Sequence, residues 1–89
     1  MTKEEATQKA RQDLAKRLGI QESQISEPSV TDTDFPDMAL GAATSGEMSG
    51  QMISKGWKIQ LKASNQQYEY RADKNQLRLY QFKGKNYKL

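Results

Sequence analysis

The sequence predicts an α+β fold in which an N-terminal helix packs on one face of a three- to four-stranded antiparallel sheet. Residues 2–19 carry helix caps around an apolar stripe of helical period. Residues 56–63 alternate apolar and polar side chains, which is typical of a strand with one buried face. Short polar links separate further alternating runs. With 89 residues and no break in composition, we expect a single domain over 1–89.

The helix is predicted over about residues 3–18. Thr2 and Glu5 match a capping box, in which each side chain accepts a hydrogen bond from the other residue's backbone. Gly19 stands where helices often end in the left-handed conformation. The apolar stripe is narrow, so this helix needs a sheet to pack on; the stripe comprises Ala6, Ala10, Leu14 and Leu18.

A strand over about 25–34 and a long loop over 36–55 are predicted next. Val30 and Phe35 are the apolar anchors of this strand, and Pro28 confines it to a sheet edge or to irregular pairing because proline lacks an N–H. Residues 36–56 hold four of the six glycines and show no regular period. Loops of this length inside a small domain are uncommon and are often functional.

Three further strands are predicted at about 56–63, 67–72 and 76–82. Trp57, Ile59 and Leu61 are expected to point beneath the helix. In the last strand we expect Leu77 and Leu79 on one face, with Arg78, Tyr80 and Phe82 on the other. The basic C-terminal residues that follow are expected to fray.

The composition argues against an enzyme. The chain has no cysteine and no histidine, which removes thiolate nucleophiles and the commonest general base. The carboxylates of Glu69 and Asp73 lie too far apart along a strand to act as a catalytic pair. We therefore predict a non-enzymatic protein without a cofactor. No apolar run approaches the ~18 residues of a membrane span, so a cytoplasmic protein without a membrane partner is expected.

A metal site is also not predicted. Asp32, Asp34 and Asp37 offer the oxygen ligands that hard cations prefer. The spacing fails as a calcium loop, however, because Pro36 and Asp37 occupy the fifth and sixth positions and Ala43 the twelfth. Aspartates that cap turns around a proline account for the same pattern.

Three kinds of binding function stay open. The first is a protein-interaction module that uses the 36–55 loop, with these contact residues: Phe35, Pro36, Asp37, Leu40, Gly41, Met48 and Gln51. The second is a nucleic-acid-binding protein, since basic and aromatic residues alternate in the C-terminal half, where residues 46–89 carry a net charge of +6. The net charge of −3 on residues 1–45 argues against it. Its contacts would be Arg71, Lys74, Arg78, Tyr80, Phe82 and Lys83. The third is a loop that occupies a protease cleft as an inhibitor.

The motifs resemble those of a small uncharacterised bacterial domain family that is common in cyanobacteria. They are Phe35-Pro36-Asp37-x-x-Leu40-Gly41, Gln51-x-x-x-x-Gly56-Trp57-x-Ile59 and Tyr68-x-Tyr70-x-x-Asp73. The resemblance covers about residues 8–73 and implies a fold rather than an activity. Where this family typically has Cys-Pro and His-Thr, the chain has Ala42-Ala43 and Arg71-Ala72. Chemistry carried by that cysteine or histidine is therefore not expected here.

Overall fold

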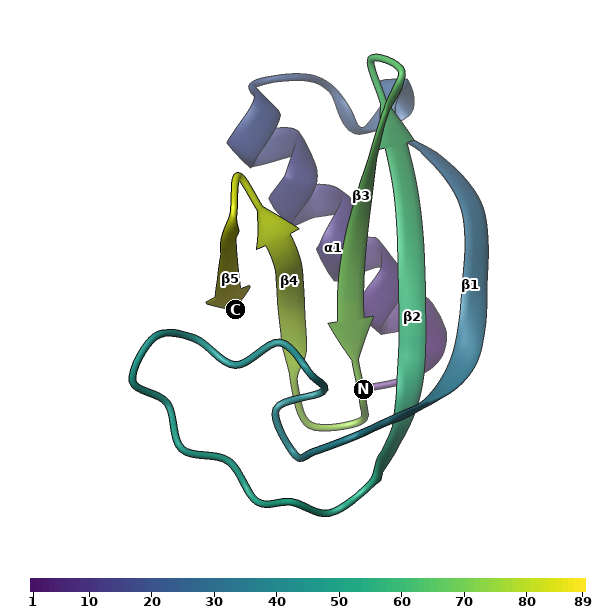
Figure 1. Cartoon of the computed structure of the whole chain (residues 1–89). Helices are drawn as coiled ribbons and strands as arrows, with labels where there is room; N and C mark the ends of the chain where they lie inside the picture. Colours follow the sequence, from purple (N-terminus) through teal and green to yellow (C-terminus); the bar gives the residue numbers. More distant parts are fainter.

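A five-stranded antiparallel meander and one helix make up the fold (Figure 1). The computed structural model describes residues 1–89. Helix α1 (Lys3–Leu18) and the 3-10 turn η1 (Glu22–Gln24) precede all strands. The strands follow in chain order, so that neighbours in sequence are neighbours in the sheet: β1 (Ser26–Phe35), β2 (Ser54–Ala63), β3 (Gln66–Ala72), β4 (Leu77–Phe82) and β5 (Lys85–Lys88).

Helix α1 begins and ends as its sequence predicts. Thr2 and Glu5 form both hydrogen bonds of the capping box, and Gly19 ends the helix at φ 67°. The helix crosses one face of the sheet, and its apolar stripe enters a core cluster of 13 buried residues. The expected α+β architecture with an antiparallel sheet is therefore confirmed.

Tyr70 is the largest fully buried side chain in this core. Its hydroxyl donates to Asp13 of α1 at 2.7 Å, and Arg17 donates to the same carboxylate oxygen at 2.6 Å. Burial raises the pKa of Tyr70, and the hydrogen bond to Asp13 raises it further. The helix is thus attached to the sheet by a polar contact as well as by apolar packing.

The sheet has five strands, and the expectation of three or four was wrong. The C-terminal residues, expected to fray, form β5 and pair with β4. Lys83 and Gly84 both adopt positive φ, at 51° and 82°, and so close a two-residue hairpin turn. Ser64 and Asn65 close the β2–β3 hairpin in the same way.

Phe82 lies on the helix face, which corrects the expectation that it faces away with Arg78 and Tyr80. The β4–β5 register shifts between Leu79 and Phe82, and Gln81 adopts φ 52° within this interval. This bulge breaks the strict alternation of the strand and returns Phe82 to the core. Trp57 is half-buried against the same core, as expected, beside the fully buried pair Ile59 and Leu61.

Candidate functional site

The segment 36–53 lies over the face of the sheet opposite α1. Tyr70 faces the helix, so its neighbour Arg71 faces the other way, and Arg78 lies directly opposite Arg71 on β4. Against these arginines pack four buried apolar residues that do not belong to the core beneath the helix: Phe35, Ala39, Leu40 and Ala42. The first half of the loop therefore closes a second, smaller core.

Side chains from the sheet and from its β3–β4 turn bind backbone carbonyls of this first half of the loop, residues 36–47, which we call the docked half. Gln76 donates to the carbonyl of Met38 at 2.8 Å, and Arg71 donates to that of Leu40 at 3.0 Å. Arg78 likewise donates to the carbonyl of Ala42 at 3.3 Å, and Asn86 donates to the carbonyl of Ala43 at 2.9 Å. The irregular backbone thus obtains from side chains the hydrogen bonds that a strand would obtain from a neighbour.

Arg78 is the centre of this docking, with 2% of its surface exposed. Its two terminal nitrogens donate to the two carboxylate oxygens of Glu47 at 2.6 and 2.7 Å, in a bidentate pair. The remaining guanidinium nitrogen, Nε, donates to Gln76. The hydrogen bonds from Arg78, followed by that from the Thr44 amide, lower the pKa of Glu47 to about 2. Glu47 therefore stays ionised and ties the far end of the docked half to β4.

Arg71 is held on three sides. The guanidinium carbon of Arg71 lies 3.7 Å from the centre of the Tyr80 ring and 5.4 Å from the centre of the Phe35 ring. Its Nε donates to Glu69 at 2.6 Å. These contacts, with the bond to Leu40, occupy the guanidinium within the protein.

A tight turn over residues 37–41 brings the loop onto Arg71. The carboxylate of Asp37 accepts from the amides of Ala39 and Gly41, at 2.9 and 3.0 Å. Leu40 and Gly41 are both left-handed, at φ 59° and 65°. A Cβ on Gly41 would lie 2.7 Å from a terminal nitrogen of Arg71, so both the φ angle and the close approach require glycine here.

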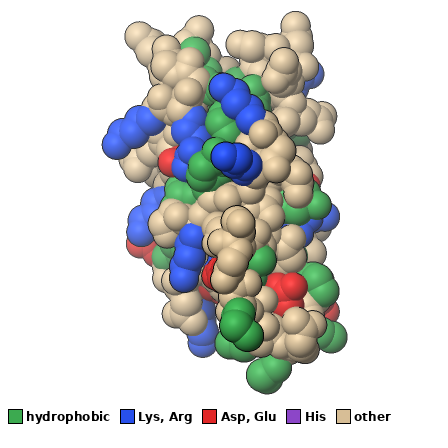
Figure 2. All heavy atoms as spheres, turned by 60° about the vertical axis from the view of Figure 1, so that its left-hand side comes forward, with side chains coloured by type: hydrophobic (Ala, Val, Ile, Leu, Met, Phe, Trp, Pro, Cys, Tyr) green, Lys and Arg blue, Asp and Glu red, His purple; other side chains and the backbone are tan.

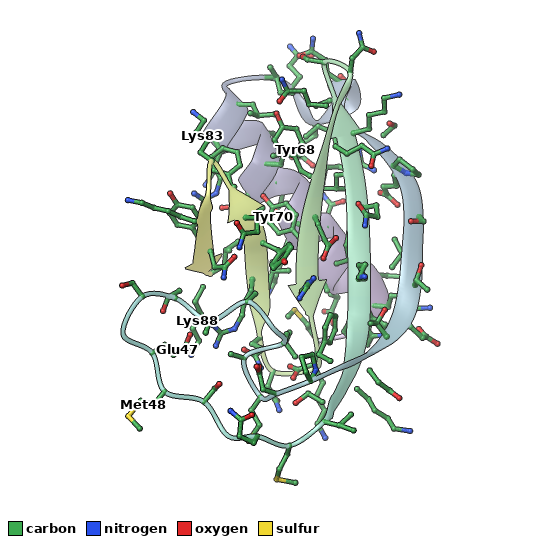
Figure 3. The ribbon with its side chains drawn as sticks, viewed as in Figure 1. Glu47, Met48, Tyr68, Tyr70, Lys83 and Lys88 are labelled. Carbon is green, nitrogen blue, oxygen red and sulfur yellow. The ribbon has the colours of Figure 1, made fainter.

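Beyond Glu47 the loop changes character and projects from the end of the sheet. Met48 is 96% exposed, and Met52 and Ile53 are 69% and 70% exposed. Met38, 50% exposed, contacts Gly50 and joins this group, which we call the apolar tip: Met38, Met48, Met52 and Ile53. Figure 2 shows apolar side chains protruding at this lower end of the molecule, and Figure 3 shows Met48 directed away from the sheet.

The predicted partner-binding residues do not form one surface. Phe35 is buried beneath the docked half, Leu40 is buried within it, and Gly41 is partly covered by Arg71. Pro36, Met48 and Gln51 are exposed, and Asp37 is engaged in its turn. Sequence reasoning missed the rest of the apolar tip, although three methionines within fifteen residues of loop were a usable signal.

The predicted nucleic-acid residues are likewise dispersed. Arg71 and Arg78 are bound to carboxylates, and Phe82 lies on the helix face. Lys74 precedes β4 and Lys83 follows it, so they lie at opposite ends of this strand. Within the set, Arg71 stacks on Tyr80, and the ammonium of Lys83 lies 5.4 Å from the ring centre of its neighbour Phe82; these two pairs are separate from each other. The structure thus presents no continuous basic and aromatic platform made of this set.

The three aspartates considered as metal ligands do not share one site. The carboxylate of Asp32 lies 3.2 Å from the ammonium of Lys3, whereas the carboxylate of Asp37 accepts hydrogen bonds from the amides of Ala39 and Gly41. No group of three or more acidic, cysteine or histidine side chains is close enough to hold a metal ion. Helix α1 lacks the length and apolar composition to cross a membrane.

These features define a class: a small α+β protein whose sheet carries a helix on one face and an anchored loop with an apolar tip on the other. The chain belongs to the family described as Domain of unknown function (DUF8738), whose match spans residues 7–80. The match therefore includes the whole loop and both arginines that hold it. No curated protein and no solved structure matches the chain. Membership of an uncharacterised family is thus confirmed, and the resemblance to cyanobacterial-type domains stays a prediction.

Proposed function

We infer that this protein is a non-enzymatic protein-interaction module that binds its partner through the apolar tip. The observation that carries this proposal is the distribution of exposed apolar side chains. The chain has five exposed large apolar residues, and four of them belong to the tip. Apolar surface gathered in one place is typical of a binding surface, whereas isolated exposed residues are ordinary.

The anchoring of the loop supports the same function. Asp37, Arg71 and Arg78 fix the docked half by hydrogen bonds, and the amide of Met38 donates to the carbonyl of Gly50 at 2.9 Å. Because the loop is ordered before binding, less conformational entropy is lost when a partner docks. Methionine side chains then adapt to the partner's surface, because they are unbranched and polarizable.

Protease inhibition is a special case of this proposal and keeps the same contact residues. Residues 47–53 contain neither helix nor strand, and they precede β2 directly. An anchored, irregular segment with an exposed apolar side chain has the form needed to occupy a cleft. Incubation with serine, cysteine and metal-dependent proteases measures this directly, since a loop inhibitor would slow one class at stoichiometric concentration.

The experiment compares three forms of the full chain as bait in native lysate: wild type, the double variant Met48→Glu/Met52→Glu, and Leu89→Glu. Leu89 is the fifth exposed apolar residue and lies outside the loop, which makes it a matched control. All three forms are first compared by circular dichroism and thermal unfolding to verify equal folding.

We expect wild type and Leu89→Glu to recover the same protein, and the double variant to lose it. With the purified partner, calorimetry should show the double variant at least about tenfold weaker, as for the loss of central contacts. Recovery of the same protein by all three forms, with equal affinity, would contradict the use of the apolar tip.

A further inference from the structure

The two edges of the sheet differ in how well they are protected. Edge strand β5 has four residues and carries Lys85 and Lys88, and a short, lysine-bearing strand resists pairing with other chains. Edge strand β1 has ten residues and no lysine or arginine. It pairs with β2 on one side only, and its other side carries no partner strand.

The open part of β1 is the stretch Ser29–Phe35. Pro28 and the register shift between Ser26 and Ser29 disrupt the first residues of the strand. From Ser29 onward the register with β2 is continuous, so this stretch is regular and extended. The only side chain that binds its backbone is Thr33, whose hydroxyl donates to the carbonyl of Thr31. Because the backbone groups of a strand point alternately to its two sides, alternate residues of this stretch offer free N–H and C=O groups to an added strand.

The side chains of this stretch favour a basic partner strand. Asp32 and Asp34 are both exposed, stand two residues apart, and so lie on the helix face of β1. Asp32 is paired with Lys3, whereas Asp34 stands opposite Lys55 in the register but forms no ion pair with it. The same carboxylates oppose pairing between two copies of β1, because like charges would then be brought together.

A hollow beside the edge provides room for a side chain. It has a volume of about 490 Å³ and is lined by Asp32, Thr33, Asp34, Lys55, Gly56 and Trp57. Trp57 lies opposite Asp32 in the register, one strand further from the edge. A lysine or arginine that enters from an added strand would meet carboxylates first and the indole behind them, and indoles attract cations.

We propose that the edge of β1 between Ser29 and Phe35 binds an extended basic peptide as a sixth strand, with alternate basic side chains beside Asp32 and Asp34. The backbone supplies most of the affinity, and Asp34 supplies selectivity for positive charge. This site is separate from the apolar tip and does not depend on its function.

The test is an NMR titration of the ¹⁵N-labelled full chain with a blocked eight-residue peptide of alternating lysine and threonine. Three comparisons accompany it. One peptide carries glutamate in place of lysine, and one carries N-methyl groups at alternate residues, which removes strand hydrogen bonds. The protein variants are Asp34→Asn and Gln12→Lys, which change the net charge equally, with Gln12 exposed on α1.

We expect the lysine peptide to shift the amide signals of residues 29–35 and the indole signal of Trp57. Asp34→Asn should weaken binding about threefold, in line with one exposed ion pair, while Gln12→Lys leaves the affinity unchanged. The N-methylated peptide should bind at least about tenfold more weakly, since an extended ligand gains its affinity from main-chain bonds.

Three results would overturn the site: no shift in residues 29–35 at about 1 mM peptide, equal binding of the N-methylated peptide, or equal binding of the glutamate peptide. The uncharged variant Met48→Ser/Met52→Ser should bind the lysine peptide as wild type does. Failure at the β1 edge is thereby distinguished from failure of the apolar tip.

Discussion

The two faces of the sheet are covered in different ways. On the helix face, 13 buried residues form a core in which the cover is a regular helix with its own backbone hydrogen bonds. On the loop face, the four buried apolar residues are Phe35 of β1 and three residues of the covering segment itself, which has neither helix nor strand. That segment is held by Arg71, Arg78 and Gln76, whose side chains bind its carbonyls.

The difference shows what each cover is suited to do. A helix satisfies its own backbone groups and needs only an apolar stripe, so its packing is specified by side-chain volume. A loop must obtain partners for its backbone groups, and here buried arginines provide them. The loop can therefore end in exposed apolar residues that take no part in holding it, and these residues are free for binding.

The largest expected effect compares two fully buried leucines, one on each face. Leu79→Ala should lower the free energy of unfolding by about 3 kcal/mol, because it leaves a cavity in the helix-face core. Leu40→Ala should cost about half as much, since the docked loop can relax toward the smaller side chain. Urea denaturation followed by tryptophan fluorescence measures both. Equal losses would mean that the loop face is as rigid as the helix face.

The helix face could be predicted from the sequence because its signals are local. Helix α1 could be predicted from its capping box and from its apolar stripe, which stops before Gly19. Strand β2 could be predicted from the alternation between Trp57 and Leu61. The errors came from turn geometry. The pair Lys83-Gly84 suits a two-residue hairpin turn, and this turn would have predicted strand β5. The bulge at Gln81, which turns Phe82 toward the helix face, has no comparable signal in the sequence.

The loop face could be predicted only in part, because its contacts join residues far apart in the chain. Glu47 and Arg78 are separated by 31 positions, and nothing in either neighbourhood indicates that they pair. Arginines on an amphipathic strand are also expected in solvent rather than beneath a loop. The sequence thus indicated the segment in which we propose the site, while the division into a docked half and an apolar tip depended on these long-range bonds.

A second comparison uses two glycines of the loop that share a left-handed backbone. A Cβ added at Gly46 would meet open space, whereas a Cβ added at Gly41 would lie 2.7 Å from Arg71. Gly46→Ala should cost about 1 kcal/mol for the backbone conformation alone. Gly41→Ala should cost about 2 kcal/mol, because Arg71 must also move from its contact with Leu40. Thermal unfolding of both variants measures the difference, and equal losses would argue against a close fit of the loop on Arg71.

The Glu47–Arg78 pair makes the loop face sensitive to acid. Glu47→Gln keeps the shape of the side chain and removes its charge, which should cost about 1–2 kcal/mol at pH 7. The pKa of Glu47 falls to about 2 in the folded protein, below its unfolded value of 4.5. Its contribution is therefore complete above about pH 4.5 and is lost as the pH falls toward 2. Urea denaturation at several pH values should show wild type and variant converging over this range; a constant difference would contradict the assignment.

The smallest expected effect is at the apolar tip. Met48→Ser and Met52→Ser should each change the free energy of unfolding by less than about 0.5 kcal/mol, since exposed side chains without partners contribute little. A larger loss would mean that these side chains pack on the protein, and the tip would not be free for a partner. An unchanged stability together with a lost partner would separate the two tasks of the loop: residues up to Glu47 hold it to the sheet, and those beyond it bind.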